Sequence, residues 1–170
     1  MEKAQNNNNA KAKQTVLQAT TDVLTLILGL AGLFYAFYEF DITLVDYKIC
    51  FGVLVVTGAL FALIFKRKHK LFLAYAVLYG GMALGFLFFL NNAFAEGTTT
   101  KIRPRIVDRQ ASAFNISKPS VTIDMDSYTK TVAIGESQDK YIAGAANIVL
   151  TVERGLLGFD IIVDKRLTDD

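Results

Sequence analysis

Two charge-free stretches constrain this chain more than any other feature. No charged residue lies between Lys48 and Lys66, and none lies between Lys70 and Glu96. A helix of about 20 apolar residues is long enough to cross the ~30 Å hydrocarbon core of a bilayer. An earlier stretch is nearly as apolar and begins close to residue 20. The sequence therefore predicts a membrane α-helical domain with three transmembrane helices, at about 20–38, 45–65 and 71–90.

The remainder of the chain has the composition of a water-soluble protein. The whole chain is 52% hydrophobic, but that average combines an apolar first half with a polar second half. The polar first residues include a run of four Asn and have nothing to bury, so we expect them to be disordered, or weakly helical towards the membrane. The expected divisions are a polar tail at 1–19, a transmembrane domain at 20–90, a linker with a basic segment at 91–110 and a small β domain at 111–170.

Alternating apolar and polar residues in the last fifty positions are typical of strands with one buried face. Gly155 and Gly158 mark a turn, and the last strand follows at Phe159–Val163, where alternate residues such as Ile161 and Val163 share one face. We predict about five short antiparallel strands, arranged as a sandwich or a curled sheet. The predicted core residues before that turn are Val121, Ile123, Met125, Val132, Ile134, Ile148, Leu150 and Val152.

Basic residues near the spans predict their orientation, because positively charged short flanks stay in the cytoplasm. The N-terminal tail and the loop between the second and third spans carry seven cations, whereas the opposite side carries five and an acidic first loop. We expect a bacterial inner-membrane protein with a cytoplasmic N-terminus and an extracytoplasmic C-terminal domain. The seven cations are Lys3, Lys11, Lys13, Lys66, Arg67, Lys68 and Lys70. The five are Lys48, Lys101, Arg103, Arg105 and Arg109.

Small residues spaced four apart occur in the first and third spans. Such residues form a groove that lets another helix approach closely and gain contacts that lipid does not provide. The groove could receive a helix of another subunit, or it could pack the three spans against one another. The predicted helix-packing residues are Gly29, Gly32, Ala36, Ala76, Gly80, Gly81 and Gly85.

Two groups of basic side chains are candidates for contact with anionic lipid headgroups or with an acidic partner. The first group is the loop with Lys66, Arg67, Lys68 and Lys70. The second is Lys101, Arg103 and Arg105, which lie on one face of an extended segment. The alternative for the second group is a solvated strand edge that Pro104 protects from pairing.

Residues for catalysis or metal binding are scarce. The only histidine, His69, lies in the basic loop, and the only cysteine, Cys50, lies in an apolar run. Asp124 and Asp126 are spaced like part of a calcium loop but lack its glycine and its distal glutamate. We expect no enzymatic activity, no cofactor and no metal, and a net charge of +2 gives no reason to expect a nucleic-acid partner.

Three functional hypotheses are compatible with these features. The leading one is a non-catalytic, multi-pass accessory or structural subunit of a larger membrane complex, whose β domain docks on partner subunits. The second is a homo-oligomeric channel or transporter component, although no ionisable residue lies in mid-span to mark an ion path. The third is a membrane-anchored binding or sensing domain that works alone.

Overall fold

The computed structural model divides the chain into two compact units. One unit combines residues 1–34 with 53–85, and the other combines 35–52 with 86–170. Each of the three long helices has residues in both units. The structure describes residues 2–66, 71–110, 119–135, 142, 144–145 and 147–168.

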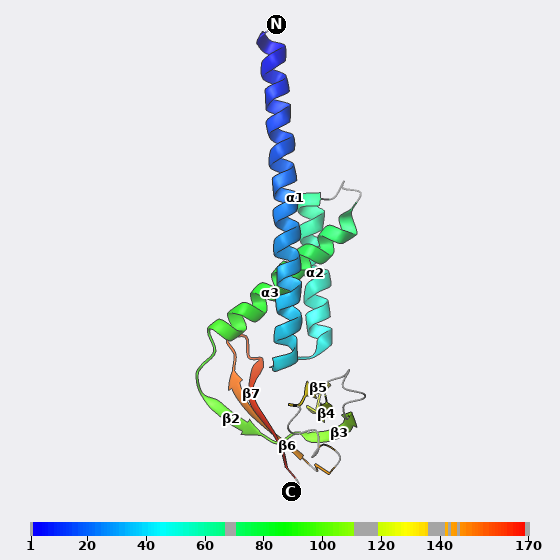
Figure 1. Cartoon of the computed structure of the whole chain (residues 1–170), viewed down its shortest axis with the longest axis vertical. Coiled ribbons are helices and arrows are strands. Elements are labelled where there is room, and N and C mark those ends of the chain that lie inside the picture. Colours follow the sequence, from blue (N-terminus) through cyan, green and yellow to red (C-terminus); the bar gives the residue numbers. More distant parts are fainter. Residues whose placement is uncertain are drawn as a thin grey trace. The chain divides into compact units, whose positions relative to one another are not determined.

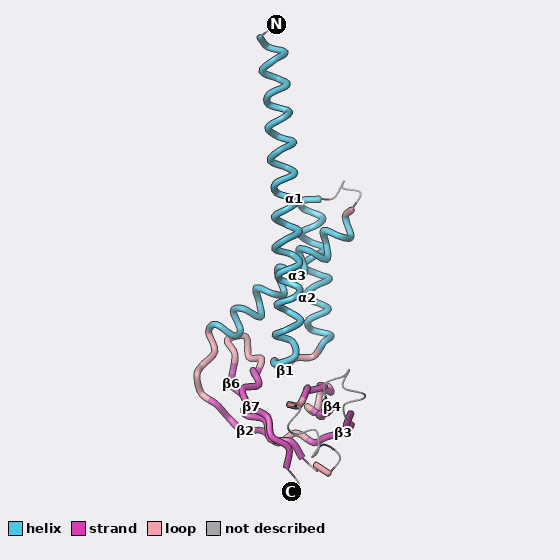
Figure 2. The backbone as a smooth tube through the Cα atoms, viewed as in Figure 1, coloured by secondary structure: helices cyan, strands magenta, loops and turns pink. Residues whose placement is uncertain are grey.

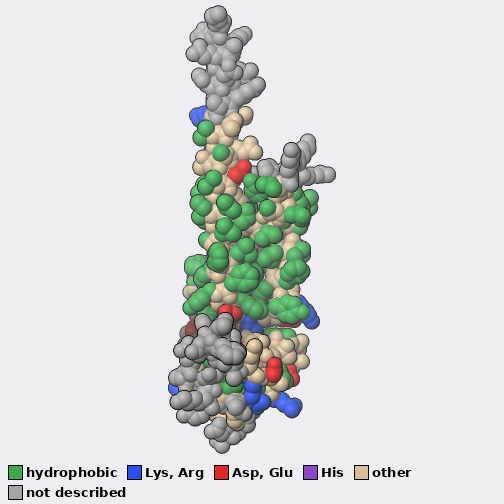
Figure 3. All heavy atoms as spheres, turned by 45° about the vertical axis from the view of Figure 1, so that its right-hand side comes forward, with side chains coloured by type: hydrophobic (Ala, Val, Ile, Leu, Met, Phe, Trp, Pro, Cys, Tyr) green, Lys and Arg blue, Asp and Glu red, His purple; other side chains and the backbone are tan. Residues whose placement is uncertain are grey.

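Three helices run through the apolar half of the chain (Figure 1). They are α1 (Glu2–Ile42), α2 (Tyr47–Lys66) and α3 (Phe72–Ala93). Each contains a stretch that is long and apolar enough to cross a membrane, which confirms the three long apolar helices predicted from the sequence. Figure 3 shows hydrophobic side chains gathered over these helices. The stretches are Lys13–Ile42, Tyr47–Phe65 and Phe72–Ala93.

Helix α1 begins much earlier than the sequence analysis predicted. It starts at Glu2, in the segment that was expected to be disordered or weakly helical. Ala, Lys and Gln in that segment favour helix, and a helix already formed in the apolar stretch grows one residue at a time at little cost. Thr21, near the expected start of the first span, therefore lies inside the helix, and its hydroxyl donates to the carbonyl oxygen of Leu17 at 2.9 Å.

Helix α2 begins with a capping aspartate. The Asp46 side chain accepts a hydrogen bond from the amide of Lys48 at 3.0 Å, and its backbone carbonyl accepts one from the amide of Ile49. An acidic oxygen at this place satisfies a free amide and complements the positive end of the helix dipole. Part of the acidic first loop therefore serves helix initiation.

The strands form one antiparallel sheet that is nearly barrel-like (Figure 2). Within the described residues the order is β1-β7-β6-β3-β4-β5, and β2 pairs with β6 beside β3. The antiparallel sheet is confirmed, and it is curled rather than a two-sheet sandwich. The strands are β1 (Thr43–Leu44), β2 (Thr99–Ile102), β3 (Arg105–Gln110), β4 (Ser120–Asp124), β5 (Thr129–Ala133), β6 (Asn147–Arg154) and β7 (Asp160–Thr168).

The segment from β2 to β3 curls the sheet. β2 pairs with β6, but after Arg103 and Pro104 the chain changes partner and β3 pairs with β4. Among the residues that the structure describes, only the Arg105–Asn147 pair joins β3 to β6. Proline has no amide hydrogen to donate to a ladder, so it suits this break between partners. These strands occupy much of the range 91–110 that was expected to be a linker.

The core of the sheet follows the predicted alternation in β4, β5 and β6. The apolar residues expected on the buried faces of these strands are all buried, and Met125 packs against them. Leu44 of β1 also belongs to this core, so the loop between the first two helices is part of the β domain. The buried cluster is Leu44, Ile106, Val121, Ile123, Val132, Ile134, Ile142, Ala145, Ile148, Leu150, Val152 and Ile162.

The predicted face of the last strand is only partly right. Ile161 is buried, as predicted, but Val163 is 57% exposed. Ile162 is the residue that pairs with the core residue Val152, so Ile162 lies in the core and the next residue, Val163, lies on the opposite face. Asp164 then pairs with Thr151, so Val163 is also the extra residue of a β-bulge, which exchanges the faces of the residues that follow it.

Candidate functional site

Buried polar side chains gather in the second unit, where the ends of α1 and α3 meet the sheet. Sequence analysis did not identify this group, because its members are far apart in the chain. Buried polar groups normally have hydrogen-bond partners, so each one indicates a specific contact. We call this group the polar junction. It consists of the buried residues Glu39, Thr43, Asn91 and Lys130, together with the exposed Asn92, which binds Glu39.

Asn91, in the last turn of α3, holds the turn between β6 and β7. Its side-chain nitrogen donates to the carbonyl of Phe159 at 3.0 Å, and its side-chain oxygen accepts from the amide of Leu157 at 3.0 Å. Its backbone carbonyl accepts from the amide of Leu156 at 3.2 Å. Asn91 is 1% exposed. The last carbonyls of a helix lack partners within the helix, and here the hairpin provides a donor for one of them.

The glycines predicted to mark this turn fit it for two different reasons. A Cβ atom on Gly155 would collide with the side chain of Asn91, so only glycine permits this approach. Gly158 has a φ of +81°, in the left-handed region that favours glycine. The amide of Gly158 donates to the carbonyl of Gly155 at 2.9 Å and closes the turn.

Glu39 and Asn92 join the last turns of α1 and α3. The side-chain nitrogen of Asn92 lies 3.2 Å from each carboxylate oxygen of Glu39, and Tyr35 shares hydrogen bonds with both residues. Glu39 is buried and belongs to α1, although the sequence suggested that it lies in an acidic loop at the membrane surface. A buried carboxylate needs such donors because water no longer solvates it.

Lys130 reaches from β5 to the end of α1. Its ammonium donates a hydrogen bond to the carbonyl of Phe40 and lies 3.2 Å from the centroid of the Phe40 ring. The last carbonyls of a helix carry partial negative charge, and the face of an aromatic ring also attracts a cation. Lys130 is only 4% exposed and pairs with Ile123, which belongs to the core.

Lys130 links β5 to the segment that precedes β1. β1 and β5 are the two outermost strands of the near-barrel, and Phe40 comes just before β1. An inward-pointing charge on an edge strand also discourages pairing with another chain. Burial lowers the pKa of Lys130 to about 8, against the opposing effect of the Asp41 carboxylate. Burial likewise raises the pKa of Tyr128, with the charges of Asp160 and Asp46 adding to the shift.

The glycines predicted to pack helices make close contacts inside the first unit. A Cβ atom on Gly85 would lie 2.6 Å from the carbonyl oxygen of Gly32, and one on Gly32 would lie 2.6 Å from that of Gly81. Gly29 faces Leu78, and a Cβ on Gly80 would collide with the backbone of Leu54. These contacts bring α3 against α1 and α2 within the chain itself, and Ala36, in the second unit, is buried.

Sequence analysis missed one glycine of this set. A Cβ atom on Gly58, in α2, would collide with the carbonyl of Ala76 in α3. Ala62 follows four residues later and is fully buried. The Gly58–Ala62 spacing is the same signal that was used in the other two spans, so the sequence contained it.

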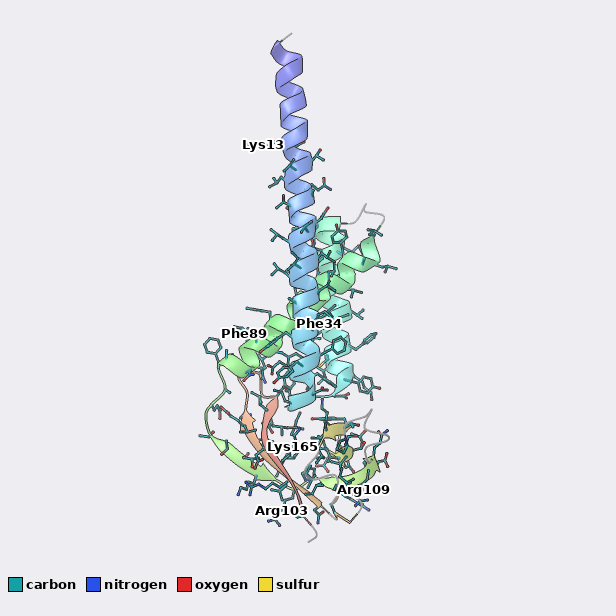
Figure 4. All side chains as sticks on the ribbon, in the orientation of Figure 1. Lys13, Phe34, Phe89, Arg103, Arg109 and Lys165 are labelled. Atoms are coloured by element: carbon teal, nitrogen blue, oxygen red, sulfur yellow. The ribbon has the colours of Figure 1, made fainter. Side chains whose placement is uncertain are left out.

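The structure describes the side chains of only one of the two predicted basic groups. Arg67, Lys68 and Lys70, and the side chain of Lys66, lie outside the described residues. Lys101, Arg103 and Arg105 are all exposed, on β2, on the break and on β3 (Figure 4 labels Arg103). Arg109 differs from them, since its guanidinium donates to the carbonyl of Ala145 at 2.7 and 3.1 Å.

The aspartates that resemble part of a calcium loop belong to a tight turn. The Asp124 carboxylate accepts a hydrogen bond from the amide of Asp126 at 3.1 Å, and Asp126 has a positive φ of 62°. Asp tolerates this backbone conformation because its short side chain can bond locally. Among the described residues, no group of three or more His, Cys, Asp or Glu side chains could hold a metal ion.

Comparisons with known protein families, with curated proteins and with solved structures found no match.

Proposed function

We propose that the three apolar helices span a membrane, with the N-terminus in the cytoplasm and the β domain outside it, as in a bacterial inner membrane. The excess of cations around the N-terminus and the 66–70 loop supports this orientation. A reporter that is active only in the cytoplasm, fused after Asp170, should give no signal. A strong signal would reverse the orientation.

We further propose a non-catalytic accessory or structural subunit whose β domain docks on partner subunits. The observation that carries this proposal is that the sheet is fastened to the helix ends at three places. These are the β1–β7 pairing, the hydrogen bonds of Asn91 and the contact of Lys130 with Phe40. A domain fixed in this way can hold a partner at a defined place, whereas a flexible tether could not.

The contact with a partner would come from the sheet rather than from the helices. The glycines that could receive a foreign helix already contact the chain's own helices. The exposed cations Lys101, Arg103 and Arg105 offer a basic surface to an acidic partner, and electrostatic attraction of this kind speeds association. This surface is therefore the proposed docking site.

Photo-crosslinking in intact membranes tests the proposal. A photoreactive residue at Arg103 should give one reproducible product with a different protein, which then co-purifies in stoichiometric amount in mild detergent. The matched control is Arg166 on β7, whose side chain is 77% exposed and which should give no such product. A monomer without crosslinks would favour the self-sufficient anchored domain, and a product with itself would favour a homo-oligomer.

A further inference from the structure

The turn between β6 and β7 exposes two leucines at its tip. Leu156 is 55% exposed and Leu157 is 41% exposed. Tight turns normally carry Gly, Asn, Asp, Ser or Pro. The two glycines that flank the leucines already supply the shape of the turn, so its geometry does not require apolar side chains at the tip.

The hydrogen bonds of Asn91 fix where this tip lies. Asn91 is in the last turn of α3, and its neighbour Asn92 contacts Glu39 in the last turn of α1. Only two residues after Glu39, the chain reaches the exposed Asp41. The tip is therefore held where the apolar helices give way to charged residues, and this is the depth of the bilayer surface if the helices span a membrane.

Aromatic residues are exposed on either side of Asn91, one in α3 and one just after its end. Phe89 and Phe94 both present more than half of their surface, and Figure 4 shows the Phe89 ring pointing away from α3. A Phe two residues before Asn91 and another three residues after it indicate an apolar surrounding at this depth. The leucines of the turn thus continue an apolar zone that the helix has begun.

We propose that Leu156 and Leu157 insert into the lipid at the membrane surface, so that the β6–β7 turn is a second attachment of the β domain to the bilayer. This inference rests on the proposed membrane-spanning function. Acyl chains are the occupant that fits, because the tip is fixed beside a helix whose neighbouring exposed side chains are themselves suited to lipid. Insertion removes apolar surface from water, which is favourable.

The absence of tryptophan from the chain makes a direct measurement possible. Leu157→Trp places a single fluorophore at the tip, and Leu156→Trp provides a second, independent position. Each full-length variant is reconstituted into phosphatidylcholine vesicles, with or without bromine atoms on the acyl chains. We expect the emission of both to shift to shorter wavelength and to be quenched by the brominated lipid.

Two further single-tryptophan variants serve as controls. Val107→Trp replaces a half-exposed valine on β3, a strand that meets β6 at Asn147, the end of β6 opposite the turn. The eight residues of β6, Asn147–Arg154, separate it from the turn by roughly 20 Å along the strand, so it should not be quenched. Phe34→Trp replaces an exposed residue within the apolar stretch of α1 and should be quenched.

The controls separate the two ways in which the inference can fail. If Phe34→Trp is quenched but both tip variants behave like Val107→Trp, the helices span the bilayer and the inserted turn is wrong. If Phe34→Trp is not quenched either, the membrane-spanning function is wrong, and the inference fails with it. Tip emission at short wavelength without quenching would show that protein covers the leucines, which also overturns the inference.

Discussion

The helix bundle and the polar junction are held together by different means. In the bundle, glycines bring backbones into contact, as at Gly32 and Gly85. In the junction, buried polar side chains connect helix ends to strands, as Asn91 and Lys130 do. The bundle relies on glycines, which lack side chains, whereas the junction relies on the hydrogen bonds of polar side chains such as Asn91 and Lys130.

If the helices span a membrane, as proposed, the difference reflects what surrounds each region. Within a bilayer, apolar side chains gain little by leaving lipid for another helix, so close packing of small residues must supply the association. At a helix end the backbone carbonyls lack partners within the helix, and a polar side chain can satisfy them. The polar junction lies where the ends of α1 and α3 offer carbonyls, and the sheet provides the donors, Lys130 and the amide of Leu156.

The largest effect should come from filling the bundle. Gly85→Ile would push a side chain into the backbone of Gly32, and the helices would have to separate. We expect a loss of about 3 kcal/mol in the free energy of unfolding, or no folded protein at all. The measurement is thermal unfolding in mild detergent.

Gly52→Ile is the matched control for this change. Gly52 lies in α2, and a Cβ atom there would meet nothing within 4 Å. The free energy of unfolding of Gly52→Ile should stay within about 0.5 kcal/mol of that of the parent. Equal behaviour of the two variants would mean that glycine contacts do not hold the bundle together.

Asn91→Ala should loosen the junction without disturbing the bundle. The amide of Leu157 and the carbonyl of Phe159 would lose their partner, at a cost of about 2 kcal/mol. Hydrogen exchange should become faster at Leu156 and Leu157. In Asn92→Ala, which removes the contact with Glu39 instead, exchange in the turn should remain slow; fast exchange there in both variants would contradict the assigned role of Asn91.

Lys130 should give the junction a pH dependence that the bundle lacks. Its pKa of about 8 in the folded protein lies below the ordinary lysine value of ~10.4, so the unfolded chain binds more protons between these values. The free energy of unfolding should therefore rise with pH, by about 1 kcal/mol between about pH 8 and about pH 9. Below about pH 8 this contribution no longer changes with pH.

Lys130→Met should remove this rise. Taking the difference between parent and variant cancels the titration of all other groups that both chains share. The measurement is a pair of denaturation series across this pH range. A difference that stays constant with pH would show that Lys130 is not buried as described.

Thr43→Val should produce the smallest change, and in the opposite direction. The Thr43 hydroxyl is buried and has no hydrogen-bond partner within the described residues. Replacing it with a methyl group of similar size should raise the free energy of unfolding by about 0.5–1 kcal/mol. Thr25→Val is the comparison, because the Thr25 hydroxyl donates to the carbonyl of Thr21. If both variants lose stability equally, the Thr43 hydroxyl has a partner.

Regular patterns in the chain predicted the regular parts of the fold. Runs without charge located the helices, and alternation located the core of β4, β5 and β6, because each of these signals lies within one short window. The early start of α1 was missed because a polar composition was taken to mean disorder. A polar sequence that favours helix can continue a helix nucleated further along the chain.

The parts that were missed depend on contacts between distant residues. β1 has only two residues, too few for any alternation to be visible, and it exists because β7 offers a free edge. The pairing of Ile162 with Val152 determines which face of β7 is buried at this point, and the local sequence pattern does not reveal that pairing. The polar junction unites Glu39, Asn91 and Lys130 from three separate segments, and nothing near any of them indicates its partners.

Disulfide trapping between β1 and β7 tests the central claim, that the sheet is built onto the helix ends, most directly. Thr43 and Ile161 are cross-strand partners, and such pairs lie about 4.5–5.5 Å apart between Cα atoms, which suits a disulfide. With Cys50 replaced by Ala, Thr43→Cys combined with Ile161→Cys should form an intramolecular disulfide in intact membranes on mild oxidation. Thr43→Cys with Val163→Cys should not form one. If neither pair forms a disulfide, or if both do equally, the loop between α1 and α2 is not a strand of the sheet and the claim is wrong.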